Sequence, residues 1–226
     1  MRPDPGTFRA RQSARRELIM LLGIAGFTAC MALFYFMLPR PDPEPNHLKG
    51  GTSLHAHPRA FPEFSLTDHR GQEFTSEALK HSWNFVFFGY TYCPDICPAT
   101  LATLDRVLST LASRDDLHAR GIFISVDPNR DTQPRLRSYV QYFNQEIIGL
   151  TGSDTDLENL CRELGVVYST PAGQESEGYL VDHSTPIFLV SPDGNLLALF
   201  GTPHDSQHIV DDFRTLNAYY SAQQGS

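Results

Sequence analysis

Cysteine is scarce in this sequence, whose 226 residues contain four: Cys30, Cys93, Cys97 and Cys161. Four thiols are too few for the disulfide framework of a small secreted domain, so the fold must depend on a hydrophobic core. Internal repeats are absent, which excludes a repeat architecture. A chain of this length, 41% of it hydrophobic, suffices for one substantial core and an appendage.

Basic residues are few beyond residue 40. Residues 1–40 carry six arginines and two acidic residues, a net charge of +4, so the rest of the chain carries −12 of the total of −8. An acidic domain of this kind is poorly suited to bind nucleic acid or to lie on anionic lipid. We therefore expect no nucleic-acid partner and a soluble domain held away from the membrane surface.

Charged residues are missing altogether from residues 18–38. As a helix this segment is about 32 Å long, which matches the hydrocarbon core of a bilayer. The arginines before it place residues 1–17 in the cytoplasm as an N-terminal arm, and the rest of the chain outside. A cleaved signal peptide is the alternative, although its apolar region is normally shorter. We expect a single-pass membrane anchor and a soluble domain on the side away from the cytoplasm.

Residues 39–60 contain several Pro and Gly and are predicted to form an extended tether. Residues 61–226 are predicted to form one domain in which strands and helices alternate. Hairpins are expected at 64–75 and 186–200, buried strands at 84–90, 121–126 and 147–150, and helices at 98–111, 134–143, 154–164 and 206–220. Alternation predicts a parallel core sheet covered by helices, to which the late hairpin adds antiparallel strands. This is a thioredoxin-like α/β arrangement.

Cys93 and Cys97 lie where a buried strand ends and a helix begins. The free N–H groups and positive end of a helix favour thiolates over thiols. Residues four apart on a helix project from the same face, so both sulfurs can reach one small ion or each other. The spacing leaves two uses open, which are electron exchange through a disulfide and binding of Cu(I) or Zn(II).

Two thiolates leave a Cu(I) or Zn(II) site open, so a further ligand is expected. His183 is the leading candidate, because it precedes a buried strand, and the loop before this strand lies beside the thiols in thioredoxin-like folds. A neutral imidazole would complete a Cys₂His set. The alternative is a hydrogen-bonded structural histidine.

Two acidic residues follow the second buried strand. Asp127 is predicted either to cap the turn at Pro128 or to act near the thiols. Asp131 is predicted to cap the next helix or to form a solvated pair with Arg130. Cys161 falls among apolar helix positions and is predicted to pack as a small hydrophobe.

Five motifs, in order and at plausible separations, resemble the Sco/SenC family across residues 61–220. They are FGYTYCPDICP at 88–98, SVDPNRDT at 125–132, LTG at 150–152, VDHS at 181–184 and SPDG at 191–194. Each motif alone is weak, but the ordered set is very specific. Tyr92 stands where many members of the family carry His.

The resemblance implies a thioredoxin-like copper protein on the outer face of an energy-transducing membrane, with Cys93, Cys97 and His183 as ligands. With the anchor at 18–38, this implies the inner (cytoplasmic) membrane and a soluble domain in the periplasm. The resemblance also implies delivery of copper to the CuA centre of cytochrome c oxidase subunit II, or reduction of that centre's cysteines. Other periplasmic copper chaperones and a thioredoxin-like reductant are further expected partners. The copper is expected as Cu(I), and use of Cu(II) stays open.

Two functions follow for the same pair. In the first, a metallochaperone that is not an enzyme binds Cu(I) through the reduced thiols and passes it on by ligand exchange. In the second, a thiol-disulfide oxidoreductase reduces the cysteines of the CuA site, with one thiolate attacking and the other resolving. Three intervening residues, rather than the usual two, argue mildly against a general redox catalyst.

Overall fold

The computed structural model describes residues 20–22, 24–31, 33–34, 48–49, 52–114, 117–169, 182–183 and 186–224, without the side chains of 52–57, 169 and 182–183. The chain divides into two compact units, Met1–Glu44 and Pro45–Ser226. In the first unit, residues 20–22, 24–31 and 33–34 are helical. Within the described ranges, no helix is both long and apolar enough to cross a membrane. The predicted anchor at 18–38 lies partly outside those ranges.

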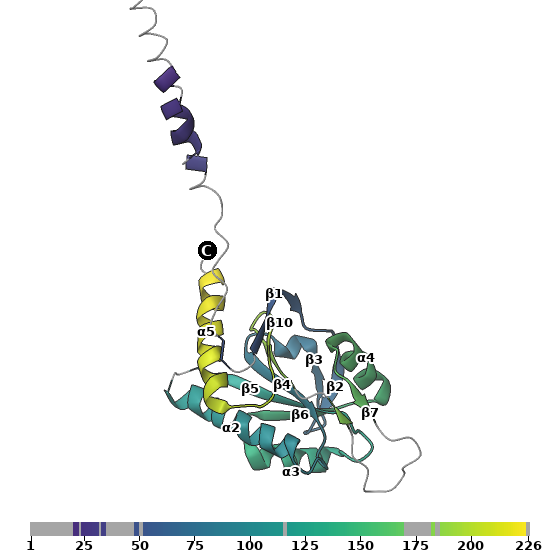
Figure 1. Ribbon diagram of the computed structural model, residues 1–226. Coiled ribbons are helices and arrows are strands. Elements are labelled where there is room, and N and C mark those ends of the chain that lie inside the picture. Colours follow the sequence, from purple (N-terminus) through teal and green to yellow (C-terminus); the bar gives the residue numbers. More distant parts are fainter. Residues whose placement is uncertain are drawn as a thin grey trace, which may run out of the picture. The chain divides into compact units, whose positions relative to one another are not determined.

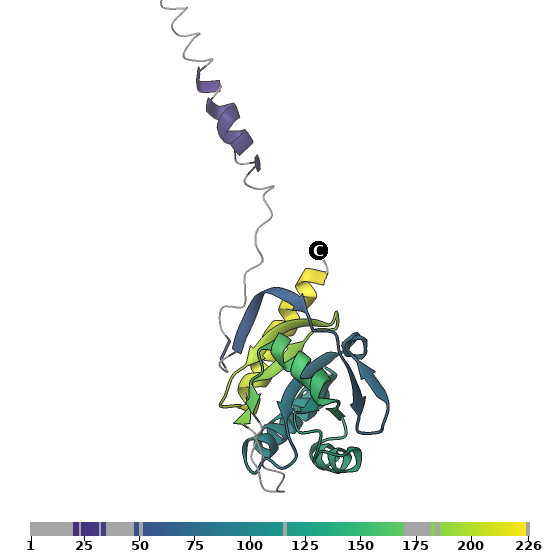
Figure 2. The same cartoon turned by 90° about the vertical axis from the view of Figure 1, so that its right-hand side faces the viewer.

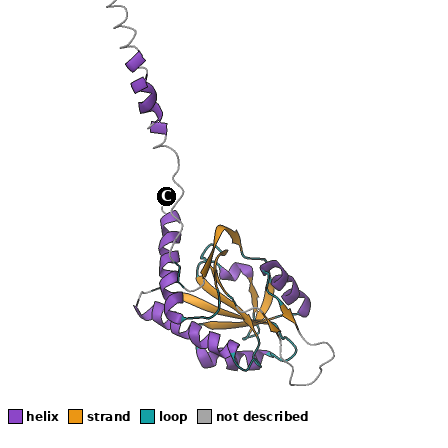
Figure 3. Cartoon of the chain, viewed as in Figure 1, coloured by secondary structure: helices purple, strands orange, loops and turns teal. Residues whose placement is uncertain are grey.

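The second unit is built on a mixed sheet, shown in Figures 1 and 3. Among the described residues eight strands form it, in the order β1-β10-β9-β4-β5-β6-β2-β3. Their bounds are β1 Thr52–Ala60, β2 Ser65–Asp68, β3 Glu73–Thr75, β4 Trp83–Gly89, β5 Ala119–Ser125, β6 Ile147–Thr151, β9 Ile187–Val190 and β10 Asn195–Phe200. A separate short pair joins β7 (Tyr168–Ser169) to β8 (Asp182–His183).

The parallel strands β4, β5 and β6 form the centre of the sheet. Every residue of β4 is buried, as expected for a strand covered on both faces. Because β5 lies beside β4 and β6 beside β5 in the same direction, right-handed crossovers place α2 (Ile96–Arg114) and α3 (Gln133–Phe143) on one face. The helix α5 (Ser206–Gln224) packs against α2.

The helix α4 (Asp154–Leu164) lies on the opposite side of the sheet from α2 and α3 (Figure 1). It ends as predicted at Gly165, whose φ of 71° is left-handed. A short 3-10 helix, η1 (Ser76–Leu79), follows β3. Cys161 on α4 is buried in the core, as predicted, and burial raises the pKa of its thiol to about 12. The mixed α/β sheet with flanking helices is confirmed.

The strand β1 differs from the prediction that residues 39–60 form only a tether. It pairs antiparallel with β10 at Thr52–Leu54 and at Arg59–Ala60, with an irregularity between them. Figure 2 shows β1 at the edge of the sheet. An edge strand makes main-chain hydrogen bonds on one side only, so it tolerates the polar composition of this segment. The sheet therefore begins nine residues before Phe61.

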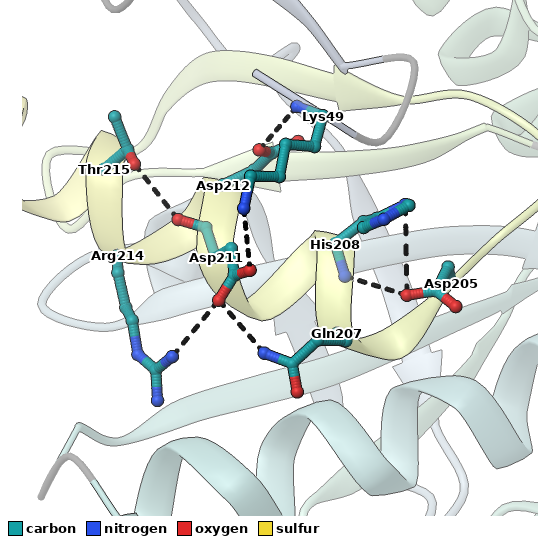
Figure 4. A network of polar contacts seen from close by, with 8 residues as sticks. All are labelled: Lys49, Asp205, Gln207, His208, Asp211, Asp212, Arg214 and Thr215. Carbon is teal, nitrogen blue, oxygen red and sulfur yellow. Dashed lines mark hydrogen bonds and ion pairs between the residues drawn. The ribbon is translucent and has the colours of Figure 1, made fainter. Parts of the chain in front are cut away.

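Within the second unit, the segment before β1 is already held against α5 through Lys49, as Figure 4 shows. The backbone N–H of Lys49 donates to the buried carboxylate of Asp212 at 2.8 Å. The Lys49 ammonium also pairs with Asp211 at 3.3 Å, where both side chains are partly exposed. An exposed ion pair contributes at most about 1 kcal/mol, so the bond to the buried carboxylate is the stronger restraint. The attachment at Lys49 shortens the stretch that can act as a tether.

Candidate metal centre

The two neighbouring cysteines lie at the predicted junction between β4 and α2. Cys93 is in the connecting loop and Cys97 is in the first turn of the helix. Both are thiols, with no disulfide between them. The backbone N–H of Cys97 donates to the Cys93 Sγ at 3.5 Å, and the N–H of Cys93 donates to the Tyr90 carbonyl at 3.3 Å. The loop therefore turns Cys93 back over the N-terminus of α2, where N–H groups stabilise a thiolate.

The two thiols are unequally exposed. Cys93 is half-buried, whereas Cys97 is completely buried. A hydrogen bond with Cys93 and burial raise the pKa of the Cys97 thiol far above its usual range, against an opposing backbone hydrogen bond from Tyr90. The pair thus presents one accessible sulfur with a second sulfur behind it.

The end of β4 makes room for the buried thiol. A Cβ atom at Gly89 would stand 2.8 Å from the Cys97 Sγ and 2.8 Å from the Phe123 ring. Both distances are too short for real contacts, so a side chain at residue 89 would displace the thiol or the ring. The glycine in the FGYTYCPDICP motif is therefore required by a close approach rather than by an unusual backbone angle.

A buried carboxylate holds the cysteine loop in place. Asp131 accepts the Thr91 N–H at 2.9 Å, the Thr91 hydroxyl at 2.5 Å and the Ser125 hydroxyl at 2.6 Å. Burial raises the pKa of this carboxyl, and the hydrogen bonds from Ser125 and Thr91 oppose the shift. The prediction of a helix cap or a solvated pair with Arg130 is wrong, because Asp131 is fully buried and joins the loop after β4 to β5.

The other acidic residue, Asp127, is the partner of Arg130, and the two side chains are 2.5 Å apart at Oδ2 and Nε. The Arg130 guanidinium also lies 4.7 Å from the centre of the Tyr92 ring, and that of Arg135 lies 3.7 Å from it. Arg135 donates from Nε to the Thr91 hydroxyl at 2.6 Å. Two cations thus contact the aromatic ring next to Cys93. Sequence reasoning missed Arg135, since only the fold brings α3 to the cysteine loop.

His183 lies in β8, opposite Tyr168 of β7. Its side chain and residues 170–181 before β8 lie outside the described residues. Within the described part of the chain, no group of three or more His, Cys, Asp and Glu could hold a metal ion. The structure therefore brings together Cys93 and Cys97, and the third ligand stays a prediction.

The family model described as SCO1/SenC matches residues 53–218, from β1 into α5. The chain belongs to the SCO1/SenC family. The match begins at β1 rather than at Phe61, in agreement with the extra edge strand. It also contains the Cys93–Cys97 loop and His183.

Two curated relatives illustrate the similarity to the SCO1/SenC family. Protein SCO2, mitochondrial, from Saccharomyces cerevisiae is 37% identical over 163 residues, which are 71% of this chain and 54% of that protein. The human Protein SCO1 homolog, mitochondrial, is 37% identical over 139 residues, which are 61% of this chain and 46% of that protein. The matched segment thus spans about half the length of these relatives.

Two solved structures of SCO1/SenC proteins share the fold. Yeast Sco1 with copper bound is 35% identical with a TM-score of 0.66, and the match covers 70% of this chain and 87% of that one. Arabidopsis thaliana ScoI with copper bound is 33% identical with a TM-score of 0.65, covering 74% of this chain and 99% of that one. These similarities agree with the predicted thioredoxin-like fold.

Proposed function

We propose that this protein is a copper metallochaperone that binds Cu(I) through Cys93, Cys97 and His183. The observation that carries the proposal is the pair of thiols at the N-terminus of α2, one half-buried and one buried behind it. Thiolates select Cu(I) among biological cations. The yeast and Arabidopsis relatives, solved with copper bound, support the same cargo here.

In this proposal the imidazole of His183 completes the site. A set of two thiolates and one imidazole holds the ion and still leaves one side open to an incoming ligand. Copper then passes by ligand exchange to the CuA centre of cytochrome c oxidase subunit II. A disulfide between Cys93 and Cys97 would remove both thiolate ligands, so the redox state of the pair controls loading.

We further propose that residues 18–38 anchor the protein in the inner membrane, with residues 1–17 in the cytoplasm and the domain in the periplasm. Support comes from the apolar side chains of the first helix, which are between 51% and 69% exposed: Met20, Leu21, Leu22, Ile24, Phe27, Met31, Leu33 and Phe34. A helix covered with exposed apolar side chains needs an apolar environment. Release of the intact protein from membranes by alkaline carbonate would contradict the anchor.

The ligand set is tested by titrating the reduced protein with Cu(I) against a competing chelator. We expect one ion per chain, bound roughly tenfold or more weakly after His183→Ala. Even the loss of a residue that only hydrogen-bonds to a metal ligand typically lowers metal affinity about tenfold or more. His208→Ala is the matched control, since this histidine lies on α5 with a half-exposed side chain. Unchanged affinity in His183→Ala would exclude that residue as a ligand.

A second function, thiol-disulfide exchange with the CuA cysteines, is favoured by the unequal exposure of the pair. An accessible thiolate at Cys93 can attack a partner disulfide, and the buried Cys97 can resolve the mixed disulfide. The test is the rate at which the reduced protein reduces an oxidised CuA domain. A rate no faster than that of a small dithiol at equal concentration would argue against this function.

A further inference from the structure

A groove of about 950 Å³ lies beside the cysteine loop. Its walls come from that loop, from the segment after β5 and from α3, and they include Tyr92, Pro98, Arg130, Arg135, Tyr139 and Tyr142. Tyr92 directly precedes Cys93, and Pro98 directly follows Cys97. A molecule bound in this groove therefore lies beside the loop that carries Cys93.

The groove is basic on an acidic domain. Its lining contains no carboxylate and two arginines. Asp127 neutralises one of them, Arg130, so the positive charge comes from Arg135, whereas the chain after residue 40 carries a net charge of −12. Arg135 is an exposed residue of α3. Its Nε donates to Thr91, and within the described residues no ion pair with a carboxylate is found for it. This charge pattern is complementary to an acidic partner.

The groove is also aromatic. Tyr142 is 83% exposed and meets Phe143 edge to face at 5.2 Å. The Tyr139 hydroxyl is buried and has no hydrogen-bond partner among the described residues. Exposed tyrosine and arginine side chains are the types that contribute most to binding at protein interfaces. The groove thus offers aromatic surface and positive charge.

We propose that this groove binds an extended acidic segment of the protein that receives the copper, and so holds the acceptor's ligands against Cys93. Residues 135 to 142 of α3 span about 10 Å, which matches about three residues of extended chain. The choice of partner, the CuA domain of oxidase subunit II, rests on the proposed function. The docking site itself rests on the charge and aromatic character of the groove.

The test measures the affinity of the full-length protein, reduced and copper-free in detergent micelles, for the purified copper-free CuA domain. We expect the dissociation constant to rise about tenfold after Arg135→Glu and several-fold after Tyr142→Ala. Tyr142 is exposed, so its truncation will not unfold the domain. Arg137→Glu is the matched control, because Arg137 is exposed on the same helix but does not line the groove.

Three outcomes would overturn the docking site. The first is that the wild type does not bind the CuA domain, and the second is that all variants bind it with equal dissociation constants. The third is self-association of the wild type that Arg135→Glu abolishes, since the groove would then hold a second copy of this chain. Titration with Cu(I) is a separate readout of the proposed function. A protein that docks through the groove but binds no Cu(I) contradicts the metallochaperone alone. One that binds Cu(I) and docks independently of the groove contradicts only the docking site.

Discussion

Gly89 and Cys97 approach so closely that a Cβ atom on Gly89 would stand 2.8 Å from the Cys97 Sγ. We expect Gly89→Ala to lower the free energy of unfolding by about 1–3 kcal/mol, because it overfills a packed core. It should also weaken Cu(I) binding, since the buried thiol has to move. Urea unfolding and chelator competition measure the two effects.

The control for Gly89→Ala is Gly165→Ala. Gly165 has a φ of +71° and nothing within 4 Å of an added Cβ, so the variant should lose about 1–2 kcal/mol by backbone strain alone. Its copper affinity should equal that of the wild type. If both variants bind copper normally, Gly89 matters for stability and not for the thiol.

Asp131→Ala should lower the free energy of unfolding by about 3 kcal/mol or more, because it leaves the Thr91 and Ser125 donors buried without their acceptor. Glu63→Ala, at an exposed position, should change it by less than about 0.5 kcal/mol. Urea unfolding monitored by circular dichroism compares the two. If Asp131→Ala lowers the free energy of unfolding by less than a single buried hydrogen bond contributes, Asp131 does not hold the cysteine loop.

Cys93 should react with iodoacetamide much faster than Cys97 in the reduced, metal-free protein. Cys93 is partly exposed at the N-terminus of α2, while the hydrogen bond with Cys93 and burial raise the pKa of the Cys97 thiol and burial shields it from the reagent. Mass spectrometry of a time course resolves the sites, and buried Cys161 serves as an internal control. In urea, which unfolds the domain, Cys93, Cys97 and Cys161 should react at similar rates. Equal rates for Cys93 and Cys97 in the folded protein would contradict the unequal exposure.

The domain should lose stability as the pH falls through about 6.5, the ordinary pKa of histidine. His69 is buried and accepts the Gly149 N–H on Nδ1 at 3.1 Å. Burial lowers the pKa of His69, Arg70 and Arg137 act in the same direction, and Asp68 opposes them. Because the pKa in the folded state lies below that in the unfolded state, the unfolded chain takes up the proton first. Protonation of the folded form would also turn the acceptor into a donor.

The measurement for His69 is the free energy of unfolding between pH 7.5 and pH 5 in the wild type and in His69→Asn. Asparagine can keep the acceptor but does not titrate, so the variant should lose less stability than the wild type. His208→Asn, at a half-exposed position, should follow the wild type. If the free energy of unfolding falls equally with pH in the wild type and in His69→Asn, His69 is excluded as the cause of the loss.

The alternating order of strands and helices could be predicted because each element carries its own signal. The β4 segment is a continuous apolar run, α4 ends at a glycine, and the turn at 191–194 contains Pro, Asp and Gly. The strand β1 has no such signal, since it contains two histidines and an arginine. Its pairing depends on the free edge of β10, which lies far away in the sequence.

The candidate metal centre likewise has features that follow from local sequence and features that depend on the fold. The sequence by itself determined that Cys93 and Cys97 stand four residues apart at a strand-to-helix junction, because spacing and hydrophobic runs are local properties. Only the tertiary structure decided that Cys97 is buried against Gly89 and that Asp131 anchors the loop through Thr91. It alone also placed Arg135 on the Tyr92 ring. These contacts join residues up to about forty positions apart, and no local pattern specifies which buried donor meets which acceptor once the sheet has formed.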